Sequence, residues 1–415
     1  MTIIRWFLSK TVREAVGMKR HVRKLLNHQR DILKPESVAS VEAALQSIGT
    51  ALKAGASKDA LKTELKQLED AANKCLRPYP HAGYRENVEV FLVAIAVAMG
   101  IRTFILQPFK IPTGSMQPTL YGVTSENLLG RKDVQVPTGW ASVRDWFAGD
   151  SYVHFVADTD GEVERIDSPV GIGRAGSIFK LYQKFVFAGK THTIWFPPDM
   201  GGGDLASRAG LQFGRQYKRG EEVINVRVRS GDHLFVDRLT YNFRAPNRGE
   251  IIVFETKGIY FQAHGGENLM PQDQFYIKRL VALGGERVQI GNDRHLQING
   301  KRLDAGTSHF EFVYGFDPKL PPLESRFSGH VNKFTAAKEA GVVMRDPRSA
   351  SDLLFLDETS VRELGPHELM VMGDNTMNSS DSRFWGSFPA NNVIGRSCFV
   401  YWPLSSRFGW ANIFH

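Results

Sequence analysis

The longest apolar stretch of the chain lies at residues 88–109, which read VEVFLVAIAVAMGIRTFILQPF. Residues 90–101 are twelve positions without a charge, and a second apolar run follows Arg102. A run of this length fits a buried core helix, but about twenty residues cross the hydrocarbon core of a membrane if Glu89 and Arg102 lie at its edges. We predict a single transmembrane helix at 87–107, with a buried core helix as the alternative.

The segment before this helix, residues 1–86, carries two periodic apolar patterns. Their members are Val38, Val41, Leu45, Ile48 and Leu52, and then Leu61, Leu65, Leu68 and Ala72. Spacings of three and four predict two amphipathic helices on either side of GASKD. We expect a helical hairpin, which is either a packing module or a docking site for another protein.

From Gln107 onward the pattern changes to short runs of alternating apolar and polar residues. Examples are DHLFVDRLTY, GEIIVFE, FYIKRLVAL, ELMVMGDN and VIGRSCFVYW. This period of two predicts a mainly β domain over residues 108–415. Two stretches, at about 122–229 and 299–366, lack the pattern, and we expect irregular insertions there.

The positive charge of the chain is concentrated at its N-terminus. The formal net charge is +8, and residues 1–34 hold nine Lys and Arg against two acidic residues. The positive-inside rule therefore places residues 1–86 in the cytoplasm and the larger C-terminal part outside. A basic segment also suits nucleic acid, but no nucleic-acid-binding motif accompanies it, so we predict no nucleic-acid partner.

Two short motifs are interpreted as a glycine loop and a turn, and the cysteines do not indicate a disulfide scaffold. The two cysteines, Cys75 and Cys398, are too few for a disulfide scaffold. GIGRAG at 171–176 has the spacing of a dinucleotide loop without a βαβ unit around it, and DTDGE at 158–162 lacks the remaining ligands of a calcium loop.

A serine stands in an unusual context at residues 111–120, IPTGSMQPTL. Gly114 permits close backbone approach and Pro112 and Pro118 stiffen the flanks, so Ser115 is displayed on a rigid turn. Most serines in such turns are structural. A serine hydroxyl is a weak nucleophile, and a catalytic role for Ser115 requires a positioned base.

The best base in the sequence is a lysine within a predicted strand. In FYIKRLVALGGE, alternation sends Tyr276, Lys278 and Leu280 to one face of the strand. If that face is buried, the pKa of Lys278 falls, whereas at the ordinary value of ~10.4 only about one lysine in a thousand is neutral near pH 7. The alternative is a surface Lys-Arg pair on an edge strand.

A third segment, MGDNTMNSSDSRFWGSFP at 372–389, has the composition of a tight, structured loop. Asp381 and Arg383 are suited to a supporting ion pair, and Ser379 supplies a hydroxyl. The alternative is an ordinary solvated loop.

Together these segments resemble the ordered motifs of the bacterial type I signal peptidases, membrane-bound Ser/Lys endopeptidases. The resemblance is carried by IRTFILQPFKIPTGSMQPTL, GDHLFVDRLTY with RGEIIVFE, YIKRLVALGGERVQI and GDNTMNSSDSRFWGSFP, in the family's order behind an apolar helix. It implies a mainly β, signal-peptidase-like catalytic domain behind one transmembrane helix and an N-terminal helical cytoplasmic region.

The resemblance also implies residue roles. These are the nucleophile Ser115, the general base Lys278, the hydroxyl Ser379 that orients the lysine, the ion pair of Asp381 and Arg383, and an oxyanion hole formed by the Ser115 N–H and the Thr113 hydroxyl. Gly373, Asp374 and Asn375 match the opening of the last motif.

The implied activity is removal of signal peptides from exported preproteins through an acyl-enzyme, without a metal or cofactor. The expected substrates end in small residues of the A-x-A kind. The expected location is a bacterial cytoplasmic (inner) membrane, crossed once, with the catalytic domain on its outer face. The lipid bilayer is an expected partner, touched also by Met116 and the tail at 405–415, and a secretion translocon is a further candidate.

Two other functions stay open at this point. One is a Ser/Lys processing protease of narrow specificity, for example one that acts on pilins. The other is a non-catalytic, membrane-anchored scaffold of the same fold.

Three features depart from the family pattern. Thr376 and Met377 stand where a charged pair is usual, and we expect weaker local support there. Gly284 and Gly285 replace a Pro-Gly, which gives a less rigid turn. Ser115 and Lys278 are 163 residues apart in the sequence, an unusually long separation that we attribute to the first insertion.

Overall fold

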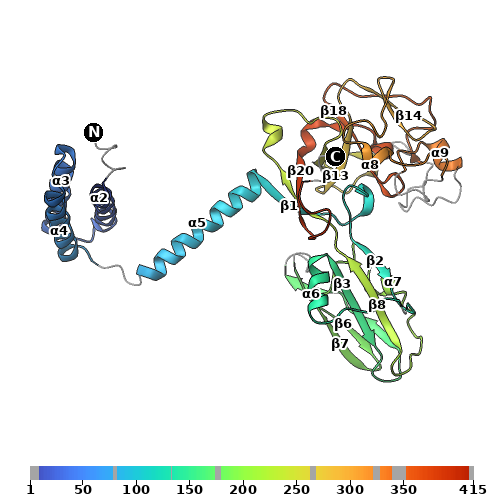
Figure 1. Ribbon diagram of the computed structural model, residues 1–415, viewed down its shortest axis with the longest axis horizontal. Coiled ribbons are helices and arrows are strands. Elements are labelled where there is room, and N and C mark those ends of the chain that lie inside the picture. Colours follow the sequence, from blue (N-terminus) through green and yellow to red (C-terminus); the bar gives the residue numbers. More distant parts are fainter. Residues whose placement is uncertain are drawn as a thin grey trace. The chain divides into compact units, whose positions relative to one another are not determined.

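The computed structural model describes residues 9–77, 82–131, 133–172, 179–261, 268–320, 328–338 and 352–410. It falls into two compact units, Met1–Val97 and Ala98–His415, which are described separately (Figure 1). Residues 173–176 of the glycine-rich stretch and 411–415 of the tail lie outside the described residues.

The first unit contains three packed helices, α2 (Lys10–Gln29), α3 (Pro35–Ala54) and α4 (Lys58–Cys75). Pro35 begins α3, Gly55 ends it in the left-handed region, and the Ser57 hydroxyl caps α4. The predicted hairpin is therefore present as α3 and α4. Helix α2, which the sequence analysis did not predict, adds a third apolar face to the core.

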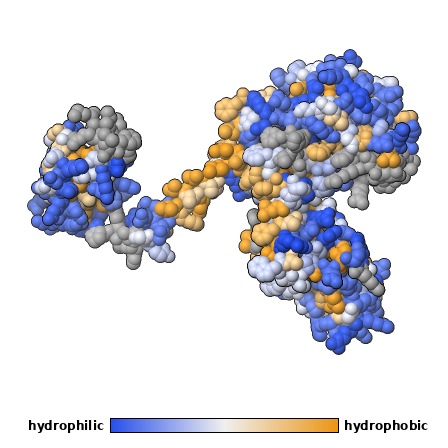
Figure 2. Space-filling view, in the orientation of Figure 1, coloured by the Kyte–Doolittle hydropathy of each residue, from blue (hydrophilic) through white to orange (hydrophobic). Residues whose placement is uncertain are grey.

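The apolar stretch forms helix α5 (Ala82–Phe104). Its segment Gly83–Phe104 is long and apolar enough to cross a membrane, and none of its apolar window is buried, which does not fit a core helix (Figure 2). The predicted end at residue 107 is wrong, because strand β1 (Leu106–Lys110) already pairs with β9 there. Pro108 explains the early end, since proline disfavours helix in the residue before it.

The second unit is mainly β, as predicted, and is built on a seven-stranded antiparallel sheet in the order β1-β9-β20-β10-β13-β18-β19. The further strands are β9 (His233–Asp237), β20 (Val393–Trp402), β10 (Ile251–Glu255), β13 (Phe275–Ala282), β18 (Glu368–Met372) and β19 (Phe388–Pro389). β13 lies inside the sheet between β10 and β18, and apolar clusters cover both of its faces.

A smaller sheet continues from β13. It comprises β14 (Arg287–Ile290), β15 (Leu296–Ile298), β16 (Lys301–Arg302) and β17 (Arg362–Glu363), and a ribbon of β11 (Tyr260–Phe261) and β12 (Asn268–Leu269) lies apart from it. Residues 299–366 also carry the short helices α8 (Glu311–Tyr314) and α9 (Lys333–Lys338). Because Phe310, Val313 and Phe355 pack into the core with Val281, the described part of this stretch is not a loose insertion.

The described residues between 122 and 229 form regular strands and helices, contrary to the prediction of an irregular insertion. They contain β2 (Thr124–Asn127), α6 (Trp140–Phe147), β3 (Asp150–Val156), β4 (Val163–Ile166), β5 (Val170–Ile172), β6 (Phe179–Phe187), β7 (Lys190–Trp195), α7 (Leu205–Ala209) and β8 (Glu222–Arg229). The strands form two sheets around their own core. Ala188 and Gly189, both at positive φ, turn β6 into β7, which is a hairpin signal that the sequence analysis overlooked.

Candidate active site

Ser115 lies in a short 3-10 turn, η1 (Gly114–Met116), and is 4% exposed. The backbone N–H of Asn375 donates to the Ser115 carbonyl at 3.0 Å, and its side-chain amide donates to the Gly114 carbonyl at 3.1 Å. These bonds fasten the serine turn to the loop that follows β18.

Gly373 allows this close approach. A Cβ at that position would lie 2.2 Å from Ser379 Oγ and 2.5 Å from the Ser115 carbonyl oxygen. No side chain fits between the two segments, so glycine is required by space rather than by its φ angle.

Lys278, on β13, reaches the serine. Its Nζ donates to Ser115 Oγ at 2.8 Å and to the Ile277 carbonyl at 3.0 Å. Burial lowers the pKa of Lys278 to about 8, while the more distant charges of Asp381 and Asp374 partly oppose the shift. The alternative of a surface Lys-Arg pair is wrong, because Lys278 is 5% exposed and Arg279 only 1%.

Asp381 and Arg383 form a bidentate ion pair in which neither side chain is exposed to solvent. Nε and Nη2 of Arg383 lie 2.8 and 2.9 Å from the two carboxylate oxygens, and the Gly373 N–H donates to Asp381 at 3.0 Å. Burial raises the pKa of Asp381, but the charge and hydrogen bonds of Arg383 outweigh it and hold that pKa below its ordinary value.

The hydroxyls of the other two predicted residues, Ser379 and Thr113, make weaker contacts in the site than the Lys278 amine does. Ser379 is fully buried, but its Oγ makes no regular hydrogen bond with any group in the described part of the chain, Lys278 included. It lies near enough to the Asp381 carboxylate to help lower that pKa. Thr113 is exposed, and its hydroxyl lies 3.5 Å from Ser115 Oγ.

A second buried ion pair lies on the opposite face of β13, and the sequence analysis missed it. Nε and Nη2 of Arg279 lie 2.8 and 2.6 Å from the carboxylate oxygens of Asp374, which also accepts the hydroxyl of Thr119 at 2.5 Å. The Gly-Asp-Asn of the last motif was a signal for Asp374, but its partner lies 95 residues away in the sequence. This pair joins β13, the loop after β18 and the segment that follows Ser115.

The expected weakness at Thr376 and Met377 is wrong. Thr376 is fully buried, its hydroxyl accepts from Arg383 and from the Val331 N–H, and its carbonyl accepts from Arg383 at 2.8 Å. Met377 packs in the apolar core. An uncharged threonine therefore supports the ion pair by accepting hydrogen bonds from the Arg383 guanidinium.

The structure corrects the expectation for Met116 and gives a reason for the glycine at position 284. A Cβ at Gly284 would lie 2.1 Å from the Pro366 carbonyl oxygen, so this turn has no room for the usual proline. Met116 is fully buried beside Leu120 and Leu234 and is not available to lipid.

A serine hydroxyl beside a buried lysine is the arrangement of hydrolases that use serine as nucleophile and lysine as base. A family model described as "Signal peptidase, peptidase S26" matches residues 84–132 and 216–402, more than half of the chain. The chain belongs to this family. The gap between the two matched segments, residues 133–215, lies inside the predicted first insertion. The predicted second insertion, 299–366, lies within the second matched segment.

Individual relatives cover part of the chain. The signal peptidase I of Leptolyngbya laminosa is 29% identical over 174 residues, which is 42% of this chain and 62% of that protein. The signal peptidase I of Bacillus caldolyticus is 27% identical over 43% of this chain and 73% of its own length. The crystal structure of a signal peptidase I from Enterococcus faecalis V583 matches with 20% identity and a TM-score of 0.20, over 37% of this chain and 97% of that one.

Proposed function

We propose that this protein is a membrane-anchored serine endopeptidase that removes signal peptides from exported preproteins, with Ser115 as the nucleophile and Lys278 as the general base. The observation that carries the proposal is the 2.8 Å contact between Lys278 Nζ and Ser115 Oγ. The two residues come from distant parts of the sequence, and both are buried. Membership of the signal peptidase family supports the same reaction.

The burial of Lys278 supports its role as a base. A lysine that is charged at neutral pH cannot accept a proton, whereas a pKa of about 8 leaves roughly a tenth of the molecules neutral at pH 7. The surrounding ion pairs of Asp381 with Arg383 and of Asp374 with Arg279 are internally neutral. They fix the backbone around Lys278 without placing a carboxylate against its amine.

The proposed reaction has two acyl-transfer steps. Neutral Lys278 takes the hydroxyl proton of Ser115 as the oxygen attacks the scissile carbonyl, and the resulting ammonium protonates the leaving amine. A water molecule then attacks the acyl-enzyme with Lys278 again as base, and the lysine ammonium returns the proton to Ser115 Oγ as the acid product leaves. The Ser115 N–H and the Thr113 hydroxyl are the proposed oxyanion donors, since that hydroxyl already lies 3.5 Å from Ser115 Oγ.

The proposed substrates and location follow from the helix and from the family. α5 ends at Phe104, eleven residues before Ser115, which keeps the serine close to the membrane surface where a signal peptide presents its cleavage site. The charge distribution favours a cytoplasmic N-terminal unit and a catalytic unit on the outer face. Small residues of the A-x-A kind are the expected sequence before the cut, in a bacterial inner membrane.

Cleavage of a preprotein with an A-x-A site tests the proposal. Detergent-solubilised full-length protein is expected to cut after the second alanine, as judged by mass spectrometry. Ser115→Ala and Lys278→Met are expected to be inactive, and Thr113→Val reduced by about a hundredfold, as for loss of one oxyanion donor.

Repeating the assay with several different preproteins separates the alternatives. A processing protease of narrow specificity would leave most of them uncut, and a non-catalytic scaffold would cut none. Activity in Lys278→Met would show that another group is the base.

A further inference from the structure

Helix α6 (Trp140–Phe147) leaves much of its apolar side exposed to solvent, although Trp146 and Phe147 also contact Trp402 on one edge. Ala141 and Asp145, one turn apart, are partly buried, and the Tyr152 hydroxyl donates to Asp145 at 3.4 Å. The opposite arc carries Trp140, Val143, Trp146 and Phe147, which are 87%, 44%, 53% and 45% exposed. A helix of a soluble protein normally has the reverse arrangement, and the contact with Trp402 leaves Trp140 and Val143 exposed together with about half of Trp146 and Phe147.

α6 is firmly attached to the main sheet. The ring centroid of Trp146 lies 4.7 Å from that of Trp402 at the end of β20, and the Leu404 N–H donates to the Phe147 carbonyl at 3.0 Å. A Cβ at Gly149, just after the helix, would lie 2.7 Å from a side-chain carbon of Pro403. The helix is therefore a fixed projection and not a loose loop.

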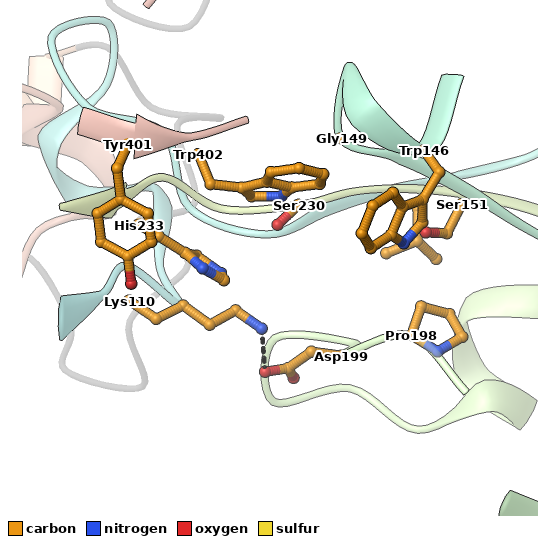
Figure 3. Close-up of a pocket in the computed structure, with 11 residues that line it drawn as sticks. Lys110, Trp146, Gly149, Ser151, Pro198, Asp199, Ser230, His233, Tyr401 and Trp402 are labelled. Carbon is orange, nitrogen blue, oxygen red and sulfur yellow. Dashed lines mark hydrogen bonds and ion pairs between the residues drawn. The ribbon is translucent and has the colours of Figure 1, made fainter. Parts of the chain in front are cut away.

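This projection lies close to the end of α5. Trp146 and Lys110 line the same cavity, and Lys110 Nζ bridges to Asp199 at 2.6 Å across it (Figure 3). Lys110 is the last residue of β1 and stands six residues after Phe104, the end of α5. Six residues of extended chain span at most about 22 Å, so the cavity lies within that distance of the point where the chain leaves the apolar helix.

The chemistry of the exposed face fits the outer interface of a lipid bilayer. Tryptophan and phenylalanine are the side chains that short interfacial helices bury among lipid headgroups. Arg144, which is 78% exposed beside Asp145, flanks the apolar arc where lipid phosphates would lie. The short chain connection to Phe104 keeps this surface near the point where the chain leaves α5.

We infer that α6 lies in the outer interface of the bilayer that α5 spans, as a second attachment of the catalytic unit to lipid. The inference rests on the membrane anchoring in the proposed function but not on the chemistry of Ser115 and Lys278. It gives the segment that the family model does not match a definite role, because a second attachment restricts rotation of the catalytic unit about α5.

Lipid-dependent quenching of a fluorophore on α6 tests the inference. The full-length chain with Cys75→Ser keeps only the buried Cys398 and receives one new cysteine, at Val143 or Trp140, for an environment-sensitive label. The protein is reconstituted into vesicles of phosphatidylcholine and phosphatidylglycerol with or without spin-labelled lipid. Ala94→Cys in α5 and Lys190→Cys at the exposed β6–β7 turn serve as lipid and aqueous controls.

The expected result is a blue shift and a loss of fluorescence to spin-labelled lipid at positions 143 and 140, comparable to position 94, with no loss at position 190. Quenching of the α6 labels by aqueous iodide, as at position 190, would overturn the inference. Protection from both quenchers would also overturn it, since a protein partner or a second copy would then cover the helix. If spin-labelled lipid does not quench the label at position 94 either, the membrane anchoring itself is rejected.

Discussion

Lys278 and Arg279 are adjacent on β13, and both are buried, yet their surroundings differ. Arg279 is paired with the Asp374 carboxylate, whereas Lys278 has no carboxylate within ion-pair distance among the described residues. A guanidinium keeps its charge at any accessible pH and needs a partner, but an amine can lose its proton. The strand thus carries a permanent cation on one face and an amine that can lose its proton on the other.

Replacing the buried lysine by an apolar residue is expected to stabilise the protein. The pKa of Lys278 falls from 10.5 to about 8 on folding, so burial of its charged form costs on the order of 3 kcal/mol below pH 8. The folded state binds fewer protons than the unfolded state between these values, so wild-type stability rises with pH across that window and is flat below it.

Thermal unfolding in detergent, followed by circular dichroism, checks this expectation. Lys278→Met should unfold at a higher temperature than wild type at pH 7, and the difference should shrink at pH 10. Lys301→Met, at an exposed position on β16, is the control and should change little. If the difference in unfolding temperature between Lys278→Met and wild type were the same at pH 7 and at pH 10, the explanation by the Lys278 charge would be contradicted.

Breaking the second buried ion pair is expected to have the opposite effect. Asp374→Asn leaves the Arg279 charge buried without its partner, which should lower the free energy of unfolding by about 3–5 kcal/mol. Glu42→Gln removes an exposed partner of Arg30 and should cost less than about 1 kcal/mol. Chemical denaturation measures the free energy of unfolding of both variants. Equal losses of this free energy would refute the expected difference between the buried and the exposed ion pair.

The residues of the site could be predicted from the sequence only in part. The strand pattern and the motif resemblance identified Lys278 and Ser115, and composition suggested the pairing of Asp381 with Arg383, which are two residues apart. Arg279 and Asp374 were not paired, because alternation says which face a side chain occupies but not what a distant segment places against it.

At the scale of elements, the turn with Ser115 is positioned by the loop that follows β18. Gly373→Ala would push this loop against the Ser115 carbonyl and Ser379. A displacement of about 1 Å at a reacting group lowers activity by about a hundredfold, and we expect a loss of this size in preprotein cleavage. Gly17→Ala, where a Cβ meets no neighbouring atom, is the matched control and should remain fully active.

The helices and strands were predicted well where the apolar residues follow one regular spacing. The helical hairpin of α3 and α4 and the apolar helix α5 have clear spacings of three and four or a continuous apolar run. The segment 122–229 was misjudged although strand β8 carries the alternating pattern, with Val226 and Val228 buried and Arg227 and Arg229 between and after them. Its hairpin signal lay in two residues of positive φ, only one of them a glycine.

At the scale of the whole molecule, α5 is the proposed link between catalysis and the membrane. Replacing Val93 and Ala94 by arginine would place two charges at the middle of the apolar helix, at a cost of about 2.5–3.5 kcal/mol each. We expect wild type to stay in the membrane pellet after alkaline carbonate extraction and the double variant to be released. The same two positions changed to leucine should behave as wild type, and release of wild type itself would reject the span.

The pH dependence of preprotein cleavage tests the central claim most directly. If neutral Lys278 is the base for Ser115, kcat/KM should rise with pH along a limb centred at about 8, and Lys278→Met should be inactive throughout. A limb centred near 10, or measurable cleavage by Lys278→Met, would contradict the account.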